Sequence, residues 1–166
     1  MKHGYAKNIS YLAMFSLISL ILSYIESLIP PLIPFPGIKL GLANTAVIFV
    51  LYKADLKGAA IVSLVRVIIS SLLFGSVVSL MYSLCGAIFS LAVMFFLKKL
   101  GCFSEIAVSV AGAVMHNIAQ LLVAYLLFSA KEIVYYLPIL MISSVITGIF
   151  IGIVSAVLIR KIKISF

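Results

Sequence analysis

The chain has 166 residues, of which 65% are hydrophobic and only 10% are charged, and its mean hydropathy is +1.35. Soluble domains carry roughly 25% charged residues, so this composition excludes a soluble globular protein and indicates a membrane protein. At about 20 residues per helical crossing, the length allows about six or seven crossings and leaves no room for a soluble domain. The formal net charge of +8 is no evidence for a nucleic acid partner, because basic residues in membrane proteins mark particular loops.

Six apolar segments follow one another along the chain. Only helices and closed barrels satisfy backbone polar groups in lipid, and these segments show no strand alternation, so all six are predicted to be helices. We expect a single all-α transmembrane domain over residues 1–166, a polytopic bundle with spans at about 9–29, 38–52, 58–74, 77–97, 106–129 and 133–159. The second span reaches only roughly 22 Å, less than the hydrocarbon layer, so something else must complete its path.

Basic residues are distributed unevenly between the two predicted sides of the membrane. One side receives nine of them: Lys2, Lys7, Lys53, Lys57, Lys98, Lys99, Arg160, Lys161 and Lys163. The other side receives only Lys39 and Lys131, and Arg66 lies within the third span. Because Lys and Arg accumulate in cytoplasmic loops, we expect a multi-pass protein of the cell membrane with both termini in the cytoplasm.

The segment Pro30–Gly41, PPLIPFPGIKLG, connects the first two spans and contains four prolines. It cannot be helical, yet it is too apolar for a solvated loop. Two interpretations are open: a rigid connection that packs on the outer surface, or a cap over a binding site, since Gly/Pro-interrupted hydrophobic segments mark transporter sites. Beside it, Lys39 and the backbone N–H groups near Gly41 would suit an anionic ligand, although Lys39 as an interfacial anchor is equally compatible.

Arg66 lies eight residues from each end of the third span, Gly58–Phe74. Arginine at the centre of a membrane helix costs about 2.5 to 3.5 kcal/mol even on translocon scales, so its side chain should face the bundle interior. Glu26, in the first span, is a candidate ion-pair partner if Arg66 extends outward. A structural pair and a ligand-facing guanidinium both remain open.

The fifth span carries one polar stripe, because His116 and Asn117 lie four and three residues before Gln120 and share a helix face with it. Amides at this depth need another helix, water or a ligand, so interhelical hydrogen bonds and ligand binding are the two interpretations. His116 has no second His, Cys or carboxylate at ligand spacing, so we expect no metal, and nothing indicates a cofactor.

The sixth span carries a ridge of small residues at four-residue spacing: Ser144, Gly148, Gly152 and Ala156. Such a ridge lets another helix approach closely, which predicts a packing role. The sequence leaves open whether the ridge faces the bundle interior or a partner protein.

The motifs LSYIESLIP (22–30), PGIKLGLAN (36–44) and HNIAQ (116–120), with the Arg66 helix, resemble the Gx transporter family, often labelled heptaprenyl diphosphate synthase component I. That family is similar to the substrate-binding S components of energy-coupling-factor (ECF) transporters. The resemblance covers nearly the whole chain and implies a six-helix bundle with an outward-facing ligand cavity capped by the first connection. It also implies a transmembrane coupling subunit and two ATPases as partners, besides a small-molecule ligand and membrane lipid. With Asn44 from the second motif, the predicted ligand-binding residues are Lys39, Asn44, Arg66, His116, Asn117 and Gln120.

These observations favour a binding subunit for uptake of a small anionic or amphipathic metabolite. Association of similar proteins with flavin transfer and membrane redox proteins suggests a flavin- or isoprenoid/quinone-related ligand. The alternatives are a membrane component of polyprenyl diphosphate or quinone synthesis and a non-transporting scaffold of a redox assembly. Prenyl transfer needs carboxylates that hold Mg²⁺, whereas the four acids are scattered in the sequence: Glu26, Asp55, Glu105 and Glu132. We therefore predict no enzyme and no catalytic residue.

Overall fold

The computed structural model describes residues 2–29, 40–128 and 135–164, with the backbone alone for residues 2–6 and 128. Six helices make up this part of the chain: α1 (Lys2–Leu28), α2 (Asn44–Lys53), α3 (Leu56–Phe74), α4 (Val77–Leu100), α5 (Glu105–Phe128) and α6 (Leu137–Lys161). These ranges contain no strand, so the predicted all-α class is confirmed. Five helices, all except α2, are long and apolar enough to cross a membrane, which agrees with a multi-pass membrane protein.

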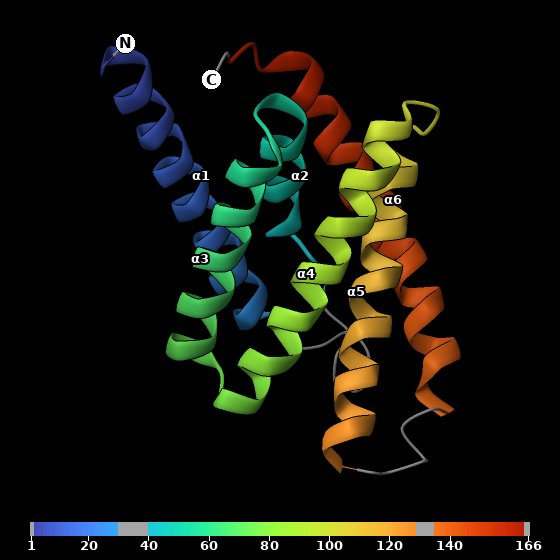
Figure 1. Cartoon of the computed structure of the whole chain (residues 1–166). Coiled ribbons are helices and arrows are strands. Elements are labelled where there is room, and N and C mark those ends of the chain that lie inside the picture. The colour runs from blue at the N-terminus through green and yellow to red at the C-terminus, as the bar shows by residue number, and fades with distance from the viewer. Residues whose placement is uncertain (1, 30–39, 129–134, 165–166) are drawn as a thin grey trace.

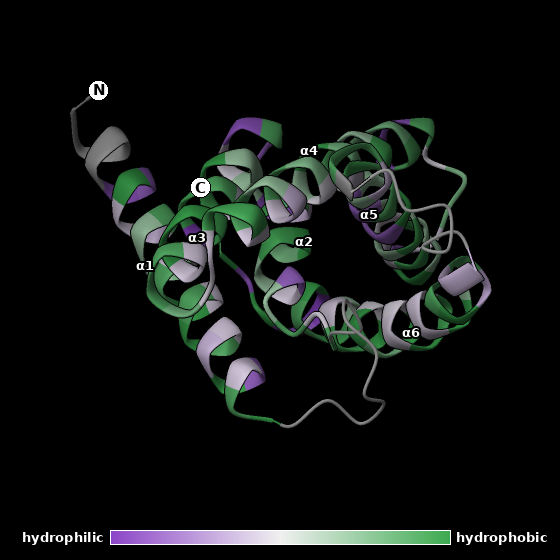
Figure 2. Cartoon of the chain, turned by 90° about the horizontal axis from the view of Figure 1, so that it is seen from below, coloured by the Kyte–Doolittle hydropathy of each residue, from purple (hydrophilic) through white to green (hydrophobic). Residues whose placement is uncertain are grey.

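The helices are arranged as a ring when the bundle is viewed along its axis (Figure 2). Around this ring α1 packs on α3, α3 on α4, α4 on α5, and α5 on α6. The short α2 closes the ring, because it contacts α6 on one side and both α1 and α3 on the other. Figure 1 shows that α2 occupies only the half of the bundle that lies nearer the two chain ends.

Basic residues gather at the end of the bundle that holds both termini, which we call the basic end. They belong to the start of α1, the α2–α3 connection, the end of α4 and the end of α6, and these four places lie together in Figure 1. The described members of the set are Lys7, Lys53, Lys57, Lys98, Lys99, Arg160, Lys161 and Lys163. Lys39 and Lys131, the two basic residues predicted for the other side, lie outside the described residues.

Helix α2 is shorter than the predicted second span, because it begins at Asn44 rather than at Ile38. Gly41 adopts a left-handed φ of 74°, and the N–H of Asn44 donates to the Gly41 carbonyl over 2.9 Å in the turn that precedes the helix. A left-handed residue is incompatible with a continuing α-helix, so the start of the helix is displaced along the chain. All residues from Thr45 to Leu51 are buried, so α2 is a core helix that is buried on every side and mostly apolar.

Glycines bring α6 into backbone contact with α5. A Cβ on Gly148 would lie 2.7 Å from Val110 Cα, and a Cβ on Gly152 would lie 2.7 Å from Ile106 Cα. Both distances are too short for any side chain, so these positions require glycine. The ridge of small residues predicted in the sixth span therefore packs inside the bundle, against α5.

Candidate functional site

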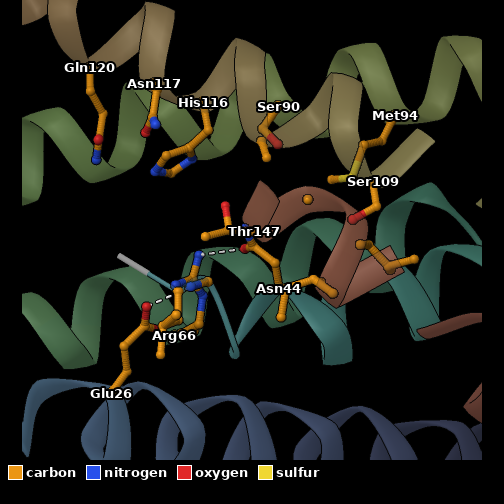
Figure 3. Close-up of a pocket in the computed structure, with 16 residues that line it drawn as sticks. Glu26, Asn44, Arg66, Ser90, Met94, Ser109, His116, Asn117, Gln120 and Thr147 are labelled. Carbon is orange, nitrogen blue, oxygen red and sulfur yellow. Dashed lines mark hydrogen bonds between the residues drawn. The ribbon is translucent and has the colours of Figure 1, made fainter. Parts of the chain in front are cut away.

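A polar pocket lies inside the apolar bundle, and all six helices contribute to its walls (Figure 3). It contains five of the six predicted ligand-binding side chains: Asn44, Arg66, His116, Asn117 and Gln120. Glu26 also lines it. The sixth predicted residue, Lys39, lies outside the described residues. Residues from α2, α3 and α5 that are far apart in the sequence thus share one cavity.

Arg66 extends from α3 toward the start of α2. Its Nη2 donates to Asn44 Oδ1 over 3.4 Å, a long hydrogen bond, and Asn44 is the first residue of α2. Its Nε is buried and has no hydrogen-bond partner within the described part of the chain. A guanidinium has five N–H donors, so this side chain retains much of its capacity to bind an acceptor.

Glu26 contacts the backbone before α2 rather than Arg66. The N–H of Gly41 donates to Glu26 Oε1 over 2.6 Å, so a carboxylate of the chain itself occupies the N–H that we expected to suit an anionic ligand. Among the described residues, the ion pair within 4.0 Å joins Arg160 to Glu105, at 3.8 Å, and Glu26 and Arg66 form no such pair. The candidate Arg66–Glu26 ion pair is therefore absent as a direct contact, although both side chains line the pocket.

Asn117 links α5 to α6. Ser144 Oγ donates its only proton to the Leu140 carbonyl over 2.6 Å, so it can only accept from the amide nitrogen Nδ2 of Asn117, which lies 2.6 Å away. This network fixes the orientation of the amide and leaves Asn117 Oδ1 without a partner in the described residues. The interhelical interpretation thus holds for the amide nitrogen, while the oxygen remains an acceptor at the pocket.

Gln120 and His116 differ in how they are held. The side chain of Gln120 makes no hydrogen bond with any described residue, although it lines the pocket. His116 packs against Gly86 of α4, where an added Cβ would lie 2.7 Å from the imidazole Cε1. The missing side chain of Gly86 therefore provides the space for the imidazole.

Several pocket-lining residues were not predicted from the sequence, and those with a heteroatom in the side chain are Ser90, Met94, Ser109 and Thr147. Isolated serines and methionines are common in apolar helices, so Ser90, Met94 and Ser109 gave no signal. Thr147 does adjoin Gly148 of the small-residue ridge, and its hydroxyl donates to the Ser143 carbonyl over 2.9 Å. Thr147 is next to Gly148, a member of the ridge through which another helix approaches closely. This position was the available indication in the sequence that Thr147 faces the bundle interior.

The model of one protein family, described as heptaprenyl diphosphate synthase component I, matches residues 15–158. The chain belongs to this family. None of the curated proteins or solved structures that were compared with the chain matches it. The matched residues include every described side chain of the pocket, from Glu26 on α1 to Ile151 on α6.

The family description names one component of a synthase, which is compatible with a subunit of a larger assembly. The described acids of this family member make separate contacts. Glu26 lines the pocket, whereas Asp55 accepts from the Gly58 N–H at the start of α3 and Glu105 pairs with Arg160 at the basic end. In the described ranges, no three His, Cys, Asp or Glu side chains come together as a potential metal site.

Proposed function

We propose that this chain is the substrate-binding subunit of an uptake system, similar to an ECF S component, for a small anionic or amphipathic metabolite related to flavins, isoprenoids or quinones. The observation that carries this proposal is a guanidinium with unused donors inside an apolar bundle, opposite the α5 stripe of His116, Asn117 and Gln120. Ionisable groups at such a depth are expensive to keep and mark ligand or ion sites by default. The arrangement fits a ligand with an acceptor group for Arg66 and a donor group for Asn117 Oδ1.

The position of α2 supports access from the side opposite the basic end. Its buried residues fill the half of the bundle near the termini, and its amino end, with Asn44, borders the pocket. With the basic end in the cytoplasm, as the positive-inside rule predicts, the ligand enters from outside. A transmembrane coupling subunit with two ATPases would then act from the cytoplasmic side, because the chain has no GxxxxGK[ST] phosphate loop of its own.

Native mass spectrometry of gently extracted protein tests this proposal. We expect a co-purifying small molecule whose occupancy falls on the order of tenfold or more in Gln120→Leu, because a polar ligand atom then loses its partner. Ser143→Ala is the matched control, since its hydroxyl bonds only within α6 and is not part of the pocket. Equal occupancy in the wild type, Gln120→Leu and Ser143→Ala would reject the pocket as the binding site.

The family description favours a second candidate, a membrane component of polyprenyl diphosphate synthesis. In that case the chain is a non-catalytic subunit that holds an isoprenoid substrate or product for a separate catalytic subunit. Purified chain incubated with an allylic diphosphate, isopentenyl diphosphate and Mg²⁺ should form no long-chain product alone. Product formation by the chain alone would overturn its assignment as non-catalytic.

A further inference from the structure

A second cavity lies on the other side of Arg66, between α1, α3 and α4, and we call it the serine cleft. Six serines from these helices line it: Ser23, Ser27, Ser70, Ser71, Ser79 and Ser83. It is at the end of the bundle opposite the basic end, where α3 ends at Phe74 and α4 begins. Arg66 and Glu26 line both the serine cleft and the polar pocket, so the two cavities meet at these two side chains.

Two buried donors in this region have no acceptor in the described part of the chain. One is Arg66 Nε, and the other is the hydroxyl of Ser23. The neighbouring Ser27 and Ser70 hydroxyls are satisfied, because they donate to the carbonyls of Tyr24 and Val67 over 2.7 and 3.3 Å. A buried polar group without a partner is destabilising, so this concentration of unmet donors at one cavity points to a missing acceptor.

We propose that the serine cleft binds a phosphate-type oxyanion between Arg66 and Ser23, with further hydroxyl groups from α3 and α4 around it. An oxyanion only accepts hydrogen bonds, which matches a lining of one guanidinium and serines from three helices. The oxygens of a phosphate group are arranged tetrahedrally and can accept from donors in different directions, whereas a carboxylate has two oxygens in one plane. Glu26 opposes this binding by its charge, but one of its oxygens already accepts from the Gly41 N–H.

Two kinds of molecule carry a phosphate group that fits this site: a membrane amphiphile and a small soluble phosphate. Phe74, which lines the cleft, has an exposed apolar side chain, as do Leu72 and Val77, which are close to it in the sequence. They suit an amphiphile whose head enters the cleft while its tail remains in lipid. Arg66 lies eight residues before Phe74, which is about 12 Å along the helix axis, so a small soluble phosphate entering from that end would also reach it.

Native mass spectrometry in a nonionic detergent tests the site with two probes, inorganic pyrophosphate and phosphatidylglycerol. At least one should bind wild-type protein, and Ser23→Ala or Ser83→Ala should weaken that binding about tenfold, because each removes a donor to a charged acceptor. Ser143→Ala, outside the cleft, should leave it unchanged. Binding of pyrophosphate identifies a soluble source, and binding of the lipid alone identifies an amphiphile.

The negative charge of Glu26 allows an independent test of whether the ligand in the serine cleft is an anion. Glu26→Gln keeps an oxygen acceptor for the Gly41 N–H but removes the negative charge, so binding of the oxyanion probe should strengthen about three- to tenfold. Weaker binding in this variant would contradict an oxyanion site, because it is the result expected for a cationic ligand. Failure of both probes to bind, or equal binding in the wild type and both serine variants, would overturn the proposal.

Two further measurements separate binding in the serine cleft from a loss of folding and from binding in the polar pocket. Ser23→Ala should not lower the unfolding temperature of the ligand-free protein, because the hydroxyl that it removes has no partner to lose. Gln120→Leu lies in the polar pocket and not in the serine cleft, so it should leave binding of both probes intact. These measurements can therefore reject oxyanion binding in the serine cleft without rejecting the proposed uptake function, and the reverse.

Discussion

Asn117 and Gln120 of α5 share one helix face but have different surroundings. The nitrogen of Asn117 donates to Ser144 of α6, whereas Gln120 makes no side-chain hydrogen bond with a described residue. Helical spacing was enough to predict that the two amides lie together with His116. It could not separate their roles, because the difference depends on where Ser144 of a distant segment comes to lie.

Replacement of each amide by leucine should separate these roles. Asn117→Leu should lower the stability of the ligand-free protein by about 0.6 to 2 kcal/mol, since it removes an interhelical hydrogen bond. Gln120→Leu should change that stability by no more than about 0.5 kcal/mol, because it breaks no contact within the described chain. Thermal unfolding of the two purified variants in detergent measures the difference. Equal losses of stability would show that Gln120 is also a structural residue.

The imidazole of His116 depends on the absence of a side chain at Gly86. In Gly86→Ala the new methyl would lie 2.7 Å from Cε1, so the ring must leave its position or α4 and α5 must separate. We expect a loss of about 1 to 3 kcal/mol, typical of overpacking. In a His116→Ala background the same glycine substitution should cost nothing. A double-mutant cycle on unfolding free energies checks this, and additive costs would disprove the contact.

At the scale of the element, α2 begins six residues later than predicted. The length of the apolar segment 38–52 correctly indicated a short helix, but hydrophobicity alone could not locate its start. The hydrogen bond from the Gly41 N–H to Glu26 is a tertiary contact that a single sequence does not reveal, and the turn in which Gly41 is left-handed lies beside it. The polar pocket was likewise predictable as a set of residues, whereas the serine cleft was not. Its serines repeat at four-residue spacing on α1 (Ser23 and Ser27) and on α4 (Ser79 and Ser83), but the sequence does not show that these helices face one cavity.

Lys98 stabilises the carboxyl end of α2 from the neighbouring α4. Its Nζ donates to the Leu51 carbonyl over 2.6 Å and lies 5.4 Å from the centre of the Tyr52 ring. Lys98→Met should therefore destabilise the protein by about 1 to 3 kcal/mol, as expected for a hydrogen bond from a charged group at a helix end. Lys99→Met is the matched control, because Lys99 is exposed and its replacement removes the same charge. Chemical denaturation in detergent that shows equal losses for both would exclude a specific role for Lys98.

At the scale of the whole molecule, the basic end predicts the orientation in the membrane. Cys102, in the connection between α4 and α5, is exposed and lies at this end, so it is a native reporter. In intact cells an impermeant thiol reagent should not label it in a Cys85→Ala background, and permeabilisation should expose it. A Lys131→Cys variant that also lacks Cys102 should show the opposite pattern. Labelling of Cys102 in intact cells would invert the topology.

The brevity of α2 also has a consequence for biogenesis. Ten residues span about 15 Å, half of the hydrocarbon layer, so α2 cannot partition into lipid as an independent segment. Helix α2 packs against α1, α3 and α6, and α6 is synthesised after the other five described helices. The core around α2 is therefore completed only after α6 has been synthesised. A nascent chain that stalls before α6 would leave one side of this apolar helix without its native neighbour, so membrane quality control has a defined surface by which to recognise unfinished molecules.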